Sequence, residues 1–188
     1  MDLVRGTRPL TAALLVLACA LPAGCGGSGT AADPAPSDAA ASPSPSGPVV
    51  PALPDAARKH TKAGAVAFVR HYIDLMNHVQ KTGRTAPIAG VSLPDCSSCN
   101  TTNRYVRRLY EAGGHLAGGR TIIRKVIDAQ SPTLYGDYVV HIAITITPSV
   151  EFTGDGGRKP YKGGRNILSV FPMWSRGQWK VAQWTRAN

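Results

Sequence analysis

The chain has 188 residues, of which 43% are hydrophobic, and its formal net charge is +10 at pH 7. This length is typical of one domain, and the hydrophobic share supplies a core but excludes a protein with several membrane-spanning helices. The positive charge favours anionic partners such as lipid headgroups, cell-wall polymers or nucleic acid, although it also serves solubility.

The first 24 residues have the order of an export signal. Positive residues precede the apolar run 9–21, which is shorter than the roughly 20 residues that a spanning helix needs. Small residues then lead to Cys25, and a cysteine directly after Ala-Gly resembles the lipobox of bacterial lipoproteins. In that family the thiol receives a diacylglycerol and becomes the mature first residue. Cys19 is the alternative, because Pro22 departs from the motif before Cys25.

This resemblance implies a signal peptide over residues 1–24 and an acylated Cys25. The protein is then expected on the extracytoplasmic side of the cell membrane, where membrane lipid holds it. Each buried methylene contributes about 0.8 kcal/mol, so two or three acyl chains anchor a protein stably. An ordinary secreted protein with incidental leader cysteines is the other interpretation.

A disordered tether is predicted from Cys25 to about residue 60. Between residues 26 and 50, Gly, Ser, Ala and Pro account for 20 of 25 positions, and Leu, Ile, Met and aromatic residues are absent. Such a composition buries too little apolar surface to offset the entropy of ordering. The globular domain is therefore expected to span residues 61–188.

Two helices are predicted at the start of this domain. The first covers residues 62–82, with Thr61 as its N-cap and Gly83 at its end. Residues 85–92 are expected to form a loop or short turn, and a second helix is expected over residues 98–112, capped by Ser97 or Ser98. The first helix carries one apolar stripe, formed by Phe68, Tyr72, Leu75, Met76 and Val79.

The pattern then alternates, which is typical of strands. Strands are predicted over residues 120–129, 137–147, 166–174 and 178–185. Residues 149–153 continue the second strand or open another, and residues 154–165 are read as a Gly-rich basic loop. Helices followed by strands indicate an α+β fold, with two or three helices on the concave side of a curved antiparallel sheet of about four strands.

Several stretches resemble a known family: residues 65–73, 75–77, Thr82-Gly83 and Cys96-Ser97-Ser98-Cys99. Together they resemble actinobacterial lipoproteins that carry the domain of unknown function numbered 6318. Residues 177–181 resemble the last hairpin of the nuclear-transport-factor-2-like, or cystatin-like, superfamily. The resemblance covers residues 51–186. It implies a conical α+β fold and a lipoprotein address, and it brings no known reaction.

Cys96 and Cys99 are the most specific chemical feature. In an exported protein two thiols this close favour a structural disulfide at the start of the second helix. A redox-active pair is the alternative, because a helix N-terminus lowers the pKa of a thiol. A zinc site needs four ligands, and no second cysteine or spaced histidine pair completes one. We therefore expect no metal and no cofactor.

The resemblance also suggests residues to inspect in a cavity. Related cone-shaped folds use Tyr, Asp or His there for isomerase and dehydratase chemistry, and the corresponding candidates are Tyr72, Asp74, Asp128 and Tyr138. None of the five histidines has a nucleophile beside it in the sequence, so a catalytic triad is unsupported. We favour a non-catalytic binding or interaction domain at the cell envelope over an extracytoplasmic enzyme or thiol-redox protein.

Two groups of basic residues are candidate contacts for an anionic surface. The first is Arg104, Arg107 and Arg108, which Arg120, Arg124 and Lys125 could extend; the second is Arg158, Lys159, Lys162 and Arg165. Aromatic residues are not interleaved with them in the manner of single-strand nucleic-acid binding proteins. Anionic lipid headgroups or cell-wall polymers are thus the expected partners, and nucleic acid is not.

Overall fold

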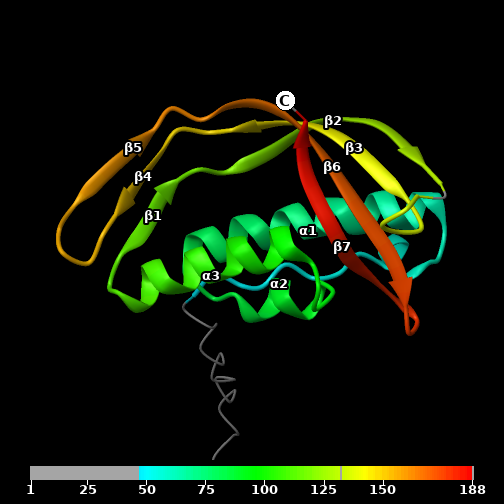
Figure 1. Cartoon of the computed structure of the whole chain (residues 1–188), viewed down its shortest axis with the longest axis horizontal. Coiled ribbons are helices and arrows are strands. Elements are labelled where there is room, and N and C mark those ends of the chain that lie inside the picture. Colours follow the sequence, from blue (N-terminus) through cyan, green and yellow to red (C-terminus); the bar gives the residue numbers. More distant parts are fainter. Residues whose placement is uncertain (1–46, 132, 188) are drawn as a thin grey trace, which may run out of the picture. The chain divides into compact units, whose positions relative to one another are not determined.

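The computed structural model describes residues 47–131 and 133–187 (Figure 1). The predicted signal peptide, both candidate lipidation sites Cys19 and Cys25, and the tether up to residue 46 lie outside the described residues. Within the described part of the chain, no helix has the length and apolarity needed to cross a membrane.

Helix α1 (Lys62–Thr82) has the predicted bounds, because its two ends carry strong signals. The Thr61 hydroxyl accepts a hydrogen bond from the Gly64 backbone N–H at 3.0 Å. Gly83 adopts the left-handed conformation, with φ 71°, that ends many helices. The predicted apolar stripe of α1 packs against the core, and Phe68 and Tyr72 are fully buried.

Two details of the remaining helices differ from prediction. Residues expected to form a loop contain the short helix α2 (Ala86–Gly90), which tolerates Pro87 because proline fits the first turn of a helix. Helix α3 (Ser97–Glu111) is capped by Cys96 rather than by Ser97 or Ser98. The Cys96 sulfur accepts the hydrogen bond from the Cys99 backbone N–H that a serine hydroxyl was expected to accept.

A four-stranded antiparallel sheet confirms the predicted α+β fold (Figure 1). The spatial order is β2-β3-β6-β7, formed by β2 (Thr121–Gln130), β3 (Val139–Ile146), β6 (Gly164–Ser175) and β7 (Gln178–Ala187). Alternate residues of these strands face α1 and complete the core, among them Val140, Ile142, Ile144, Val170, Trp179 and Val181. We call this face of the sheet the inner face and the opposite one the outer face.

A second sheet was not predicted. It has the order β1-β4-β5 and consists of β1 (His115–Gly118), β4 (Ser149–Phe152) and β5 (Arg158–Tyr161). The expected Gly-rich loop over residues 154–165 therefore contains a strand. Each strand of this small sheet is joined to a strand of the large sheet by only two residues. The small sheet thus continues three long strands past a sharp bend, and it curves toward α3 (Figure 1).

Glycines make the bend possible. Gly118 and Gly163 have φ of 80° and 70°, in the region that only glycine enters readily. A Cβ on Gly118 would lie 2.3 Å from the Pro148 carbonyl oxygen, and one on Gly163 would lie 2.3 Å from the Ile146 carbonyl oxygen. At Gly118 the end of β1 therefore approaches the β3–β4 connection more closely than a residue with a side chain would permit. At Gly163 the β5–β6 connection approaches the end of β3 in the same way.

The segment before α1 belongs to the folded domain, although its composition assigned it to the tether. It contains the 3-10 helix η1 (Asp55–Arg58), whose Ala57 is only 1% exposed within the core. Leu53 packs against the same core. These two apolar residues supply the burial that stabilises a short segment rich in Pro and Ala. The domain consequently begins before Leu53 and not at residue 61.

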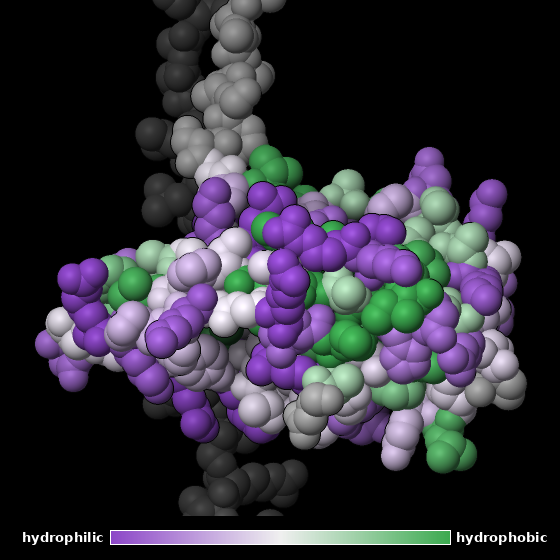
Figure 2. Space-filling model, turned by 90° about the horizontal axis from the view of Figure 1, so that it is seen from above, coloured by the Kyte–Doolittle hydropathy of each residue, from purple (hydrophilic) through white to green (hydrophobic). Residues whose placement is uncertain are grey.

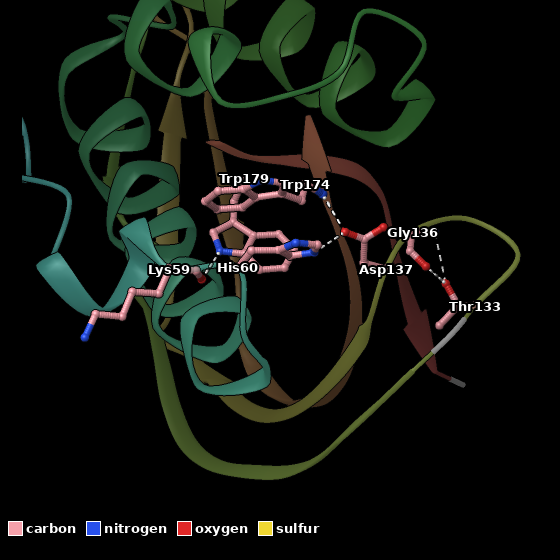
Figure 3. Close-up of polar contacts among 7 residues, drawn as sticks. All are labelled: Lys59, His60, Thr133, Gly136, Asp137, Trp174 and Trp179. Atoms are coloured by element: carbon pink, nitrogen blue, oxygen red, sulfur yellow. Dashed lines mark hydrogen bonds and ion pairs between the residues drawn. The ribbon is translucent and has the colours of Figure 1, made fainter. Parts of the chain in front are cut away.

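Aromatic residues fix the end of this segment (Figure 3). The Trp179 indole N–H donates to the Lys59 carbonyl oxygen at 3.1 Å. The His60 ring stacks on Trp174 with ring centroids 5.0 Å apart, and its Nε2 lies 2.9 Å from Asp137 Oδ2. Asp137 also accepts a hydrogen bond from the Trp174 backbone N–H at 3.0 Å. The N-terminal segment is thereby held against the β6–β7 hairpin.

Candidate functional site

A cavity of about 670 Å³ lies under the bend of the strands, on the inner side of the sheets. Helices α1 and α3 and strands β1, β6 and β7 all contribute to its wall. The residues that bear on its chemistry are Gln80, Tyr105, Leu116, Tyr161, Lys162 and Arg186. A concave site with a mixed apolar and polar wall is typical of small-molecule binding.

The charged side chains of the cavity wall are both cations. Lys162 follows β5 and Arg186 lies near the end of β7, and no carboxylate is among the lining residues. Within residues 47–131 and 133–187, neither cation has an acidic group at ion-pair distance. An anionic group entering the cavity would meet two uncompensated positive charges.

Gln80 presents an unsatisfied polar atom near the same wall. Its backbone carbonyl accepts a hydrogen bond from the Tyr110 hydroxyl at 2.5 Å, which fixes the end of α1 against α3. Its side-chain Oε1 is buried and has no hydrogen-bond partner among the described protein atoms. A buried carbonyl without a partner costs about 1–3 kcal/mol.

Two tyrosines at the edge of the cavity share one carboxylate. The hydroxyls of Tyr105, on α3, and Tyr161, on β5, donate to Glu151 Oε2 at 2.5 and 2.6 Å. The Tyr105 hydrogen bond, and then that of Tyr161, lower the pKa of Glu151. Burial, and then the bond to Glu151, raise the pKa of Tyr105. Glu151 therefore stays ionised and ties α3 to the small sheet instead of serving as a proton donor.

The predicted disulfide between Cys96 and Cys99 is present, with a Cα–Cα distance of 5.3 Å. Both cysteines are essentially fully buried, at 0% and 1% exposure. The Tyr72 hydroxyl, whose pKa burial raises to about 12, donates to the Cys99 sulfur at 3.3 Å. The disulfide clamps the first turn of α3 beneath the core, and its burial shields it from a redox partner.

The model of the family described as "Family of unknown function (DUF6318)" matches residues 34–185. The chain belongs to DUF6318. No curated protein matches it.

The DUF6318 domain is similar to solved structures at low identity. The intermembrane space region of the chloroplast protein ARC6 has 10% identity and a TM-score of 0.47, over 68% of this chain and 97% of that chain. An uncharacterized protein with a cystatin-like fold from Caulobacter vibrioides has 10% identity and a TM-score of 0.43, over 66% and 91%. Aln2 from a Streptomyces species has 8% identity and a TM-score of 0.40, over 64% and 87%. These similarities carry no information on function.

The DUF6318 domain does not bring the four predicted cavity residues together. Tyr72 is a core residue, and Asp74 is exposed on α1. Tyr138 packs edge-on against Trp179, with ring centroids 5.9 Å apart. Asp128 lies on the outer face of β2, because it pairs with His141 in the row that points away from the helices. None of the four lines the cavity under the bend.

The outer face of the large sheet of this chain holds a row of Ser, His and Asp that was not predicted from the sequence. Strand register places Asp128, His141 and Ser169 side by side on β2, β3 and β6. His141 Nδ1 lies 2.8 Å from the Ser169 hydroxyl, but His141 Nε2 is 3.9 Å from Asp128, too far for a hydrogen bond. Ser169 is only 9% exposed, and β6 is paired on both sides, so its backbone N–H groups are engaged. The row lacks the oxyanion site of a hydrolase.

In the predicted basic group on α3, one arginine has an acidic partner among the described residues. Arg107 Nε lies 3.7 Å from Glu111 Oε1 one turn further on. Arg104 and Arg108 line a separate cleft of about 440 Å³ that also contains Glu151.

The second predicted basic group is divided by the bend. Arg158 and Lys159 lie on β5 and stack over the rings of Phe152 and Tyr161, at 5.2 and 5.3 Å from the ring centroids. Lys162 lines the inner cavity, whereas Arg165 lines a groove on the outer face. This separation follows from strand β5, which was not predicted. Residues 154–165 were expected to form one loop, in which these four basic residues would lie together.

Proposed function

We propose that this chain is a membrane-anchored extracytoplasmic lipoprotein whose DUF6318 domain binds a small anionic molecule in the cavity under the bend, without catalysing a reaction. The observation that carries the binding proposal is the cavity wall itself. It combines two cations that have no acidic partner among the described residues, Lys162 and Arg186, with apolar residues such as Leu116. This arrangement fits a ligand with an anionic group and an apolar part.

The proposed membrane anchor rests on the leader sequence. The apolar run before Cys25 and the small residues around it have the order of a lipoprotein signal. The domain begins before Leu53, so the proposed tether ends earlier than residue 60. Acylation of Cys25 would hold the domain close to the outer surface of the membrane.

The alternative of an enzyme or a thiol-redox protein has less support. Redox chemistry requires a reachable sulfur, and the Cys96–Cys99 sulfurs are buried at the start of α3. General acid catalysis at the cavity edge requires a carboxyl group that carries a proton, and Glu151 has a lowered pKa. The geometry therefore favours binding without turnover.

An anionic dye tests the proposed ligand site. The probe is 1-anilinonaphthalene-8-sulfonate, which has a sulfonate, an N–H donor and apolar rings. The chain from Pro43 to Asn188 contains the whole described core and is used as the soluble protein. We expect saturable binding with one dye per chain. Lys162→Gln should raise the Kd on the order of tenfold, the loss of a charged contact.

Gln80→Leu should leave the chain as stable as the wild type or more stable by about 1–3 kcal/mol, because it removes a buried atom without a partner. Arg107→Gln removes the same charge as Lys162→Gln at a site away from the cavity, and its Kd should stay within a factor of two. Equal Kd values for all four chains would contradict the proposal, as would the absence of saturable binding.

A further inference from the structure

The outer face of the large sheet carries a groove, on the side of the sheet opposite the inner cavity. The groove has a volume of about 1020 Å³. Arg124 of β2 and Arg165 of β6 line it, and Ala143, Ile167 and Ala187 form an apolar floor. Arg186 touches the end of the groove, but its pairing with Leu168 places its side chain on the inner face. Figure 2 shows this side of the molecule, where hydrophobic surface gathers over the sheet and hydrophilic side chains border it.

The two groove arginines, Arg124 and Arg165, have no acidic partner. Within residues 47–131 and 133–187, neither has a carboxylate at ion-pair distance, and no acidic residue lines the groove. Arg124 is also oriented, because its Nε donates to the Thr145 hydroxyl at 3.0 Å. This contrasts with α3, where Arg107 pairs with Glu111. The groove therefore presents two guanidinium groups that have no acidic partner among the described residues.

We propose that this groove binds a linear polyanion whose phosphodiester groups are joined by short carbon segments, as in a poly(glycerol phosphate) chain. Guanidinium groups bind phosphate through two parallel hydrogen bonds, and arginines on separate strands can engage successive phosphates. The apolar floor then contacts the carbon segments between them. A groove with half-exposed apolar residues, such as Ile167 at 41% exposure, suits this alternation of charge and carbon.

The shape of the site favours a chain over a lipid bilayer. A phosphatidylglycerol headgroup presents the same chemistry, but a bilayer is nearly flat and would contact the rim of a groove before its floor. A flexible chain can enter the groove and reach both the arginines and the apolar residues. The proposal does not depend on the inner cavity, because Arg124 and Arg165 line only the groove.

Fluorescence anisotropy with a labelled poly(glycerol phosphate) chain tests this proposal on residues 43–188. Arg124→Gln with Arg165→Gln should weaken binding at least tenfold. It should also reduce the slope of log Kd against log salt concentration by about two, one for each lost phosphate contact. Arg104→Gln with Arg107→Gln removes the same net charge from α3, and should change the Kd by less than twofold and leave the slope intact.

Equal losses for the two double variants would overturn the proposal, because binding would then follow net charge rather than the groove. Competition against the labelled chain, with either the free polymer or phosphatidylglycerol vesicles, distinguishes the two sources of glycerol phosphate. We expect the free polymer to displace the labelled chain at a lower phosphate concentration than the vesicles do. Tighter binding to the vesicles would instead make the groove a membrane contact and overturn the assignment to a polymer.

Discussion

Gly163→Ala is expected to destabilise the domain by several kcal/mol and to abolish dye binding in the inner cavity. The new Cβ would lie 2.3 Å from the Ile146 carbonyl oxygen and 2.9 Å from the Pro148 backbone nitrogen, and neither backbone atom can move without shifting β3. The left-handed φ of 70° adds about 1–2 kcal/mol for any residue with a Cβ. Chemical denaturation with a two-state fit measures the loss.

Gly156 provides a matched control for this prediction. Its φ is 89°, but a Cβ there would have no atom within 4 Å. Gly156→Ala should therefore cost about 1–2 kcal/mol, the conformational part alone, and should leave the cavity intact. If the two variants were equally stable, close approach of the strands at the bend would not be what requires glycine at position 163.

Trp179→Ala is expected to cost about 3–5 kcal/mol, the range for removal of a buried large aromatic side chain. Trp179 is 2% exposed and contacts aromatic rings from three parts of the chain, those of Phe68, Tyr138 and Trp174. Its indole N–H is also the group that binds the Lys59 carbonyl. The variant should lose global stability and, in the remaining folded molecules, release the segment before α1.

Limited trypsin digestion reads out that release, because Arg58 and Lys59 lie in the segment. Cleavage there should be at least tenfold faster in Trp179→Ala than in the wild type. The digestion is done without denaturant, at a temperature at which both chains are folded. Trp174→Ala removes a less buried ring, which stacks on His60 and meets Trp179 edge-on, and should have the smaller effect on both stability and cleavage. Unchanged cleavage in Trp179→Ala would show that the segment is held by other contacts.

The parts of the fold that the sequence predicts well are those with local signals. Thr61 and Gly83 mark both ends of α1, and alternation marks the core strand β3. The break between the predicted strands 166–174 and 178–185 is another example, since Arg176 and Gly177 both have positive φ, of 52° and 78°, as a tight hairpin requires. In each case a few neighbouring residues decide the conformation.

The bend and the small sheet were missed because their cause is not local. Gly118 and Gly163 look like turn glycines in the sequence, and only the pairing of their strands with β3 and β4 shows why each must lack a side chain. The short strand β5 is exposed along its length and has no apolar alternation. Composition likewise assigned residues 51–60 to the tether, although Ala57 and Leu53 are packed against the core.

The candidate sites depend even more on register. Arg124 and Arg165 are far apart in the sequence and line one groove only because β2 and β6 belong to one sheet. The same is true of the Asp128, His141 and Ser169 row. Charge and composition could predict that the domain favours anions, but the places where it would bind them required the three-dimensional arrangement.

The intact mass of the chain, extracted from the membranes of the cell that makes it, tests whether lipid holds this protein with its folded domain outside the cell. We expect a polypeptide that begins at Cys25, carries a diacylglyceryl group, and is two hydrogens lighter through the Cys96–Cys99 disulfide. A soluble chain that still begins at Met1, without acyl groups and with free thiols, would contradict it.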